Sequence, residues 1–175
     1  VGLSKLISES YINGQDKDVP YFTTKKILNK NSGLIVLSGC TDGLLTECSS
    51  YSDIAVAEQM VNKRKQVFAD RFYLEVQRVG RAGEEALINR MVELAIKYQL
   101  PMVATNGSCF LTRDEFEAHE ARVCINQGRV LSDSRRAKTH TEQQYLKSQE
   151  EMLELFSDLP EAIENSVEIA KRCNI

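Results

Sequence analysis

The 175-residue sequence has little of several features that would assign it quickly. It has no Trp, 3 Pro, 9 Gly and 2 His, too few Gly and Pro for a linker or a fibrous protein. No apolar run approaches the roughly 18 residues of a membrane-spanning helix. The 22 Lys and Arg against 25 Asp and Glu give a net charge of −3, which argues against a protein that coats duplex nucleic acid. With 42% hydrophobic residues, the chain is expected to form a globular domain.

Cysteine usage points to a reducing compartment. The 5 cysteines are odd in number and contain no Cys-x-x-Cys pair, so neither a disulfide framework nor a zinc knuckle is indicated. The chain begins Val1-Gly2 without a Met or a signal peptide, which suggests a fragment or a processed chain. We therefore expect a cytoplasmic location and no membrane partner.

Three short apolar segments predict buried strands at residues 34–37, 72–76 and 102–104. Apolar residues at helical spacing predict helices over 53–68 and 84–98, between these strands. Alternation of strand and helix predicts parallel strands joined by right-handed crossovers, and hence an α/β fold.

The flanking segments are predicted to be helical. Apolar spacing indicates short helices over 3–12 and 24–28. Two capping boxes, Thr112 with Glu115 and Ser148 with Glu151, predict helices over 116–127 and just after residue 148. A last helix is expected over 161–173, after a Pro at its start.

Candidate chemistry lies at the carboxyl ends of the predicted strands, where parallel α/β folds place their working residues. Cys40 and Cys109 follow the first and third strands, so they could approach one another and hold a soft metal. Against this, two thiolates make only half of a tetrahedral site, and small side chains packed at a loop rim are the simpler interpretation. Glu75 lies in an otherwise apolar strand and needs either an ion-pair partner or a water-filled site.

Other motifs are weaker. A nucleophilic pair of Cys109 and His119 rests on one of only two histidines, and residues 38–43 lack the Gly-Lys-Ser/Thr ending of a phosphate-binding loop. Arg135, Arg136 and Lys138 could meet phosphate, although a solvated loop is the simpler reading. Residues 141–175 hold eight acids and three bases, a net 3 − 8 = −5, which disfavours contact with a nucleic-acid backbone.

Ordered blocks along the whole chain carry a family resemblance. They are LISESY at 6–11, GLIVLSGC at 33–40, DRFYLE at 70–75, LPMVATN at 100–106, HE at 119–120, EEM at 150–152 and IAKRCN at 169–174. In these blocks the sequence resembles the PHP (polymerase and histidinol phosphatase) domain of bacterial replicative DNA polymerase III alpha subunits. The opening His-x-His strand of that family is absent, so the chain looks like the later part of the domain.

The resemblance implies a partial PHP-type (β/α) barrel with mainly parallel strands, followed by a C-terminal helical segment. Residues 1–128 would form the barrel sector, and residues 129–175 would form the loop and helices that lead towards the palm. Family members have a metal cluster at the strand ends. Cys40 falls at a position where many relatives bind metal, whereas the family pattern Thr-Asn-Asp-x-His reads Thr105-Asn106-Gly107-Ser108-Cys109 here.

With Gly107 in place of an acid, the resemblance implies a broken cluster, in which Cys40 and Cys109 are vestigial metal candidates, and no catalytic residue in this segment. It implies a segment of the polymerase subunit that acts as a structural and docking module for the polymerase core and a proofreading exonuclease subunit. The parent would be a DNA-directed DNA polymerase that uses Mg²⁺ in its palm; no cofactor is expected here, and DNA contact would be weak or absent. The alternative is a residual metal-dependent phosphoesterase or exonuclease.

Overall fold

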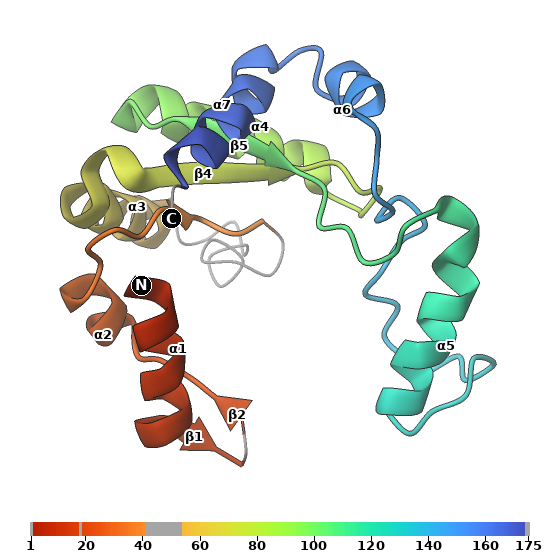
Figure 1. Ribbon diagram of the computed structural model, residues 1–175. Coiled ribbons are helices and arrows are strands. Elements are labelled where there is room, and N and C mark those ends of the chain that lie inside the picture. Colours follow the sequence, from red (N-terminus) through yellow and green to blue (C-terminus); the bar gives the residue numbers. More distant parts are fainter. Residues whose placement is uncertain (1, 18, 41–53, 174–175) are drawn as a thin grey trace.

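The computed structural model describes residues 2–17, 19–40 and 54–173. Its helices and strands follow in Figure 1 from red to blue. The helices are α1 (Gly2–Asn13), α2 (Thr24–Asn29), α3 (Ile54–Phe68), α4 (Glu84–Tyr98), α5 (Phe116–Asn126), α6 (Gln149–Leu155) and α7 (Pro160–Arg172). The strands are β1 (Gln15–Asp16), β2 (Val19–Pro20), β3 (Val36–Leu37), β4 (Phe72–Gln77) and β5 (Met102–Thr105). Within these residues no helix is both long and apolar enough to cross a bilayer.

The central sheet has the strand order β3-β4-β5, and both pairs are parallel. The register aligns Val36 with Phe72 and Leu74 with Met102. Helix α3 precedes β4 and helix α4 connects β4 to β5, as expected for parallel neighbours. The α/β class is confirmed; the described strands form an open sheet that fits a partial PHP-type barrel, without closing into one.

The core lies on one face of β4. Phe72, Leu74 and Val76 alternate along the strand and are fully buried. They share a hydrophobic cluster with Ile88 and Met91 of α4, the helix whose predicted bounds the structure reproduces. Each such side chain contributes about 1.5–3 kcal/mol when it leaves water, so this face holds the sheet against its helices.

The opposite face of β4 is more polar. Tyr73 is buried, while Glu75 and Gln77 are half-buried on the same side of the strand. The period of two places these three side chains together and away from the hydrophobic cluster. Polar chemistry in the sheet is therefore confined to this second face.

The C-terminal helices pack on the sheet. Helix α7 lies along β5, and the amide of Asn165 donates a hydrogen bond of 2.8 Å to the Met102 carbonyl. Phe156 and Ala162 belong to the same hydrophobic cluster as β4. The division of the chain at residue 128 stays a prediction, and residues beyond it contribute to the common core.

Local capping signals were predictive. Both capping boxes, Thr112 with Glu115 and Ser148 with Glu151, form as expected. The predicted cap Asp53 lies outside the described residues. The first strand is shorter than the predicted 34–37, because the Leu34 N–H bonds back to Asn31 and the Leu34 carbonyl accepts from Arg71 at 2.9 Å. Residue 34 therefore belongs to a turn.

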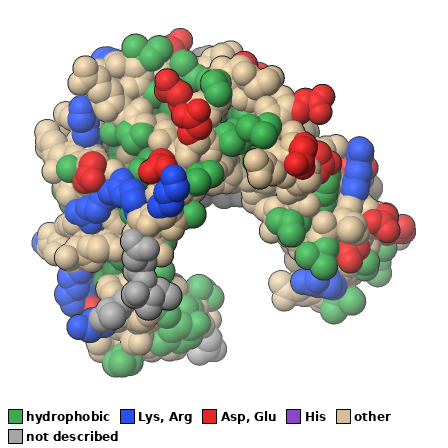
Figure 2. All heavy atoms as spheres, turned by 45° about the horizontal axis from the view of Figure 1, so that its top comes forward, with side chains coloured by type: hydrophobic (Ala, Val, Ile, Leu, Met, Phe, Trp, Pro, Cys, Tyr) green, Lys and Arg blue, Asp and Glu red, His purple; other side chains and the backbone are tan. Residues whose placement is uncertain are grey.

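The molecule has the shape of an arch. The sheet with α3, α4 and α7 forms its top, α1 with the β1–β2 hairpin descends on one side, and α5 descends on the other (Figure 1). Figure 2 shows the same opening between the two sides in space-filling form. The site described below lies on the α5 side.

Arg78 connects the sheet to the C-terminal helices. Its guanidinium bonds Asp158 at 2.6 Å and Glu85 at 2.8 Å and lies over the Phe156 ring at 5.1 Å. The hydrogen bond from Arg78 lowers the pKa of Asp158 below its ordinary value of 3.8. The folded protein therefore holds this proton less tightly than the unfolded chain.

A pH dependence follows from this depressed pKa. The contribution of Asp158 to stability should be present above pH 3.8 and should be lost as the pH falls through the lower, folded-state pKa. We expect Asp158→Asn to lower the midpoint of urea unfolding at pH 7 and to differ less from wild type at pH 3. Glu93→Gln, remote from Arg78, is the control. An equal deficit at both pH values would contradict a role through the carboxylate charge.

Candidate functional site

Glu75 is enclosed by neutral hydrogen-bond donors at the ends of the strands. The Thr105 hydroxyl donates to its carboxylate, and the Gln77 amide donates to Glu75 at 3.2 Å and to Thr105 at 2.9 Å. The Ser38 hydroxyl accepts the Glu75 backbone N–H at 2.9 Å. Within the described residues, the Glu75 Oε1 atom thus accepts from a hydroxyl and an amide group, and no salt bridge to a base is found there.

Gly107 follows β5 with a φ of +56°, in the left-handed region. A Cβ at this position would lie 3.4 Å from the Gln77 side chain and 3.6 Å from that of Gln144. A residue with a side chain would be strained in this conformation, although its Cβ would make only ordinary van der Waals contacts with the two amides. The loop therefore carries no acid, and a side chain at position 107 would require a strained backbone.

A different group of potential ligands lies beside this loop. Cys109 comes from the loop after β5, His119 from α5 and His140 from the segment before α6. One ligand atom of each residue lies within 4.8 Å of the others. The two imidazoles meet edge to face with centroids 4.6 Å apart, and Phe110 packs against His119 with centroids 5.4 Å apart.

His119 is the unusual member of the group. Both of its ring nitrogens are buried, and neither has a hydrogen-bond partner among the described residues. An unsatisfied buried polar group costs about 1–3 kcal/mol. Burial lowers the pKa of His119 below 6.5, and His140 and Arg122 lower it further, so the imidazole is neutral at neutral pH. Its lone pair is therefore available to a ligand.

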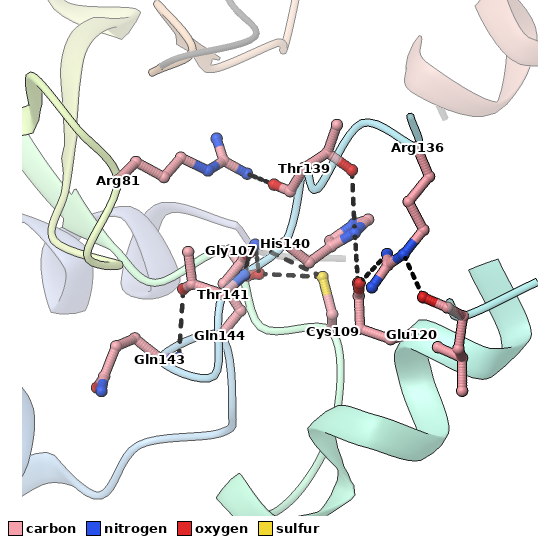
Figure 3. A network of polar contacts seen from close by, with 11 residues as sticks. Arg81, Gly107, Cys109, Glu120, Arg136, Thr139, His140, Thr141, Gln143 and Gln144 are labelled. Atoms are coloured by element: carbon pink, nitrogen blue, oxygen red, sulfur yellow. Dashed lines mark hydrogen bonds and ion pairs between the residues drawn. The ribbon is translucent and has the colours of Figure 1, made fainter. Parts of the chain in front are cut away.

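The segment that carries His140 is anchored on both sides. Gln144 accepts the Cys109 N–H at 2.8 Å through its carbonyl and donates its side-chain amide to the Gly107 carbonyl at 3.0 Å. The Thr141 hydroxyl donates to the Val79 carbonyl of the loop after β4. Figure 3 shows Gln144 next to Gly107 and Cys109, with Glu120 on the neighbouring helix.

A buried ion pair borders the site. Arg136 and Glu120 are in direct contact, with side chains 8% and 5% exposed. The Glu120 carboxylate also lies 3.8 Å from Nδ1 of His140, which contacts the Thr139 hydroxyl at 3.1 Å (Figure 3). Arg136 thus holds a carboxylate next to one of the three candidate ligands.

Cys109 and His119 open onto a surface depression of about 570 Å³. It is also lined by Glu115, Arg122 and Leu146. The site is therefore accessible from solvent on the side of α5 that faces residues 108–111.

The structure brings only one of the two predicted metal-binding cysteines into this group. Cys109 lies in the group just described, whereas Cys40 is buried after β3 and is not part of that group. The predicted association of Cys40 with Cys109 stays a prediction. The sequence offers only His119 and His140 as nitrogen ligands, but no spacing rule connects His140 with Cys109, 31 positions away, so it was not assigned to a site.

In the basic cluster of Arg135, Arg136 and Lys138, both arginines form ion pairs with acids. Arg136 pairs with buried Glu120, and the Nε of Arg135 contacts Asp133 at 3.1 Å. Two of the three bases in the cluster therefore already pair with acids of the same chain, which disfavours the phosphate interpretation of this cluster.

Comparison with known proteins defines the class. Residues 2–79 match the family model described as the PHP domain. Over 99% of its length the chain is 48% identical to the protein named DNA polymerase III subunit alpha in Pseudomonas fluorescens. It is 46% identical to that of Pseudomonas aeruginosa and 42% identical to that of Escherichia coli strain K12.

Over 99% of its length the chain is therefore similar to part of DNA polymerase III alpha subunits, and over residues 2–79 to the PHP domain, so the resemblance predicted from sequence is confirmed. It spans 15% of the length of each of these relatives.

Proposed function

We propose that this chain is the PHP segment of a replicative DNA polymerase alpha subunit and acts as a non-catalytic structural and docking module. In this proposal the parent chain is a DNA-directed DNA polymerase, with Mg²⁺ bound in a palm outside these residues. The segment supports the polymerase core and presents a surface to a proofreading exonuclease subunit. The names of the relatives support the parent activity.

The observation that carries the non-catalytic role is the small number of potential metal ligands at the described ends of the strands. Glu75 is bonded to Thr105 and Gln77, and Gly107 stands where the family pattern has an acid. A phosphoesterase of this type needs several carboxylates and imidazoles around its metals. The strand-end residues described here offer one carboxylate, and its Oε1 already accepts from Thr105 and Gln77.

Two measurements on the full-length parent chain test this proposal. Hydrogen exchange should show protection within residues 2–173 when the proofreading exonuclease subunit is added, and no protection there would contradict docking. With Mn²⁺ or Zn²⁺, cleavage of a chromogenic phosphodiester and of a primer 3′ end should not exceed the metal-only background. Cleavage that Glu75→Gln abolishes and the matched control Glu85→Gln retains would establish the phosphoesterase alternative.

A further inference from the structure

We propose that Cys109, His119 and His140 bind a single zinc ion. The site shares Cys109 with the strand-end pattern of the family but is otherwise different, because it takes its other two ligands from α5 and the segment before α6 and uses neither Glu75 nor the position of Gly107. It also departs from the expectation that this segment binds no cofactor. The inference does not rest on the proposed docking role.

The donor set selects the metal class. One thiolate and two imidazoles form a borderline-soft set that suits Zn²⁺ and its spectroscopic substitute Co²⁺ better than Mg²⁺ or Ca²⁺. Ligand atoms around tetrahedral zinc are about 3.3–3.6 Å apart. The three atoms here lie within 4.8 Å of one another, so side-chain movements of about 1 Å bring them to bonding distance.

The unpartnered imidazole is an independent indication of a ligand. His119 has two buried nitrogens without hydrogen-bond partners among the described residues, and it points into the same group as Cys109 and His140. Coordination would satisfy one of these nitrogens.

The surroundings resemble the outer shell of a metal site. Metal-binding imidazoles usually contact a carboxylate that orients the ring. Glu120, held by Arg136, lies 3.8 Å from Nδ1 of His140 and is placed for this role. The Gln144 amide approaches the Cys109 sulfur at 3.7 Å and would stabilise its thiolate.

Binding would occur with loss of the Cys109 thiol proton to solvent, since only the thiolate is a metal ligand. Three protein ligands leave a fourth tetrahedral position for water, and the depression beside Cys109 and His119 provides access to it. Because the three ligands come from three segments, zinc would join α5 to the segment of residues 139–146.

The test is metal binding by the purified, metal-free protein under reducing conditions. We expect one equivalent of zinc, and one equivalent of Co²⁺ with the d–d bands of a tetrahedral ion and a thiolate charge-transfer band. Cys109→Ser should abolish the charge-transfer band. His119→Gln and His140→Gln should each weaken zinc binding at least about tenfold. Replacing a residue that only contacts a metal ligand already weakens binding by about that factor.

Matched variants separate this site from other thiols. Cys173→Ser, at an exposed cysteine, should bind zinc as wild type does. Cys40→Ser should also retain binding; loss of zinc in Cys40→Ser together with retention in His140→Gln would overturn the proposal in favour of a Cys40–Cys109 site. Zinc well below one equivalent in wild type would overturn it as well.

A second readout guards against variants that fold poorly. Zinc should raise the thermal midpoint of the wild type, and a chelator should reverse that rise. The rise should be smaller in His140→Gln, whose circular dichroism should match that of the metal-free wild type. A rise in the midpoint of His140→Gln equal to that of wild type would contradict the assignment.

Discussion

Replacing Phe156 by Ala is expected to lower the free energy of unfolding by about 3–5 kcal/mol, the usual cost of removing a fully buried aromatic ring. Phe156 is 0% exposed and lies between α6 and α7, within the cluster that also contains Leu74 and Ala162. The variant would leave a cavity where the C-terminal helices meet the sheet. It would also remove the ring beneath the Arg78 guanidinium, 5.1 Å from its centroid.

Equilibrium unfolding in urea, followed by circular dichroism, measures this loss. Leu153→Ala on α6 is the control, because its side chain is about half exposed and its removal should cost far less. A loss below about 1 kcal/mol for Phe156→Ala would mean that the C-terminal helices do not share the core of the sheet.

The second large effect is expected from Arg136→Met, at about 3–5 kcal/mol. The substitution leaves the Glu120 carboxylate buried without its cation, and an unpaired buried charge is strongly destabilising.

Two further variants make this prediction specific. Arg136→Met combined with Glu120→Leu removes both charges and should recover most of the loss. Arg113→Met breaks the Arg113–Glu142 pair, in which both side chains are more than half exposed, and should change stability far less than Arg136→Met does. Equal losses in Arg136→Met and Arg113→Met would show that burial of the pair does not matter.

Local signals in the sequence determined much of the secondary structure. The apolar spacing of α4 and the two capping boxes are short-range patterns, so they specify where helices begin and end without knowledge of the fold. The alternation of helices and apolar strands likewise predicted that β3, β4 and β5 run parallel to one another.

The candidate site required the tertiary structure. Cys109, His119 and His140 lie in separate segments, and no spacing rule connects them. The segment that carries His140 reaches the other two because Gln144 anchors it to the loop after β5 and Thr141 anchors it to the loop after β4. Arg136 likewise reads as a solvated base in sequence and proves to be buried against Glu120. A sequence pattern reports periodic burial along one element, whereas contacts between distant segments depend on how the elements pack.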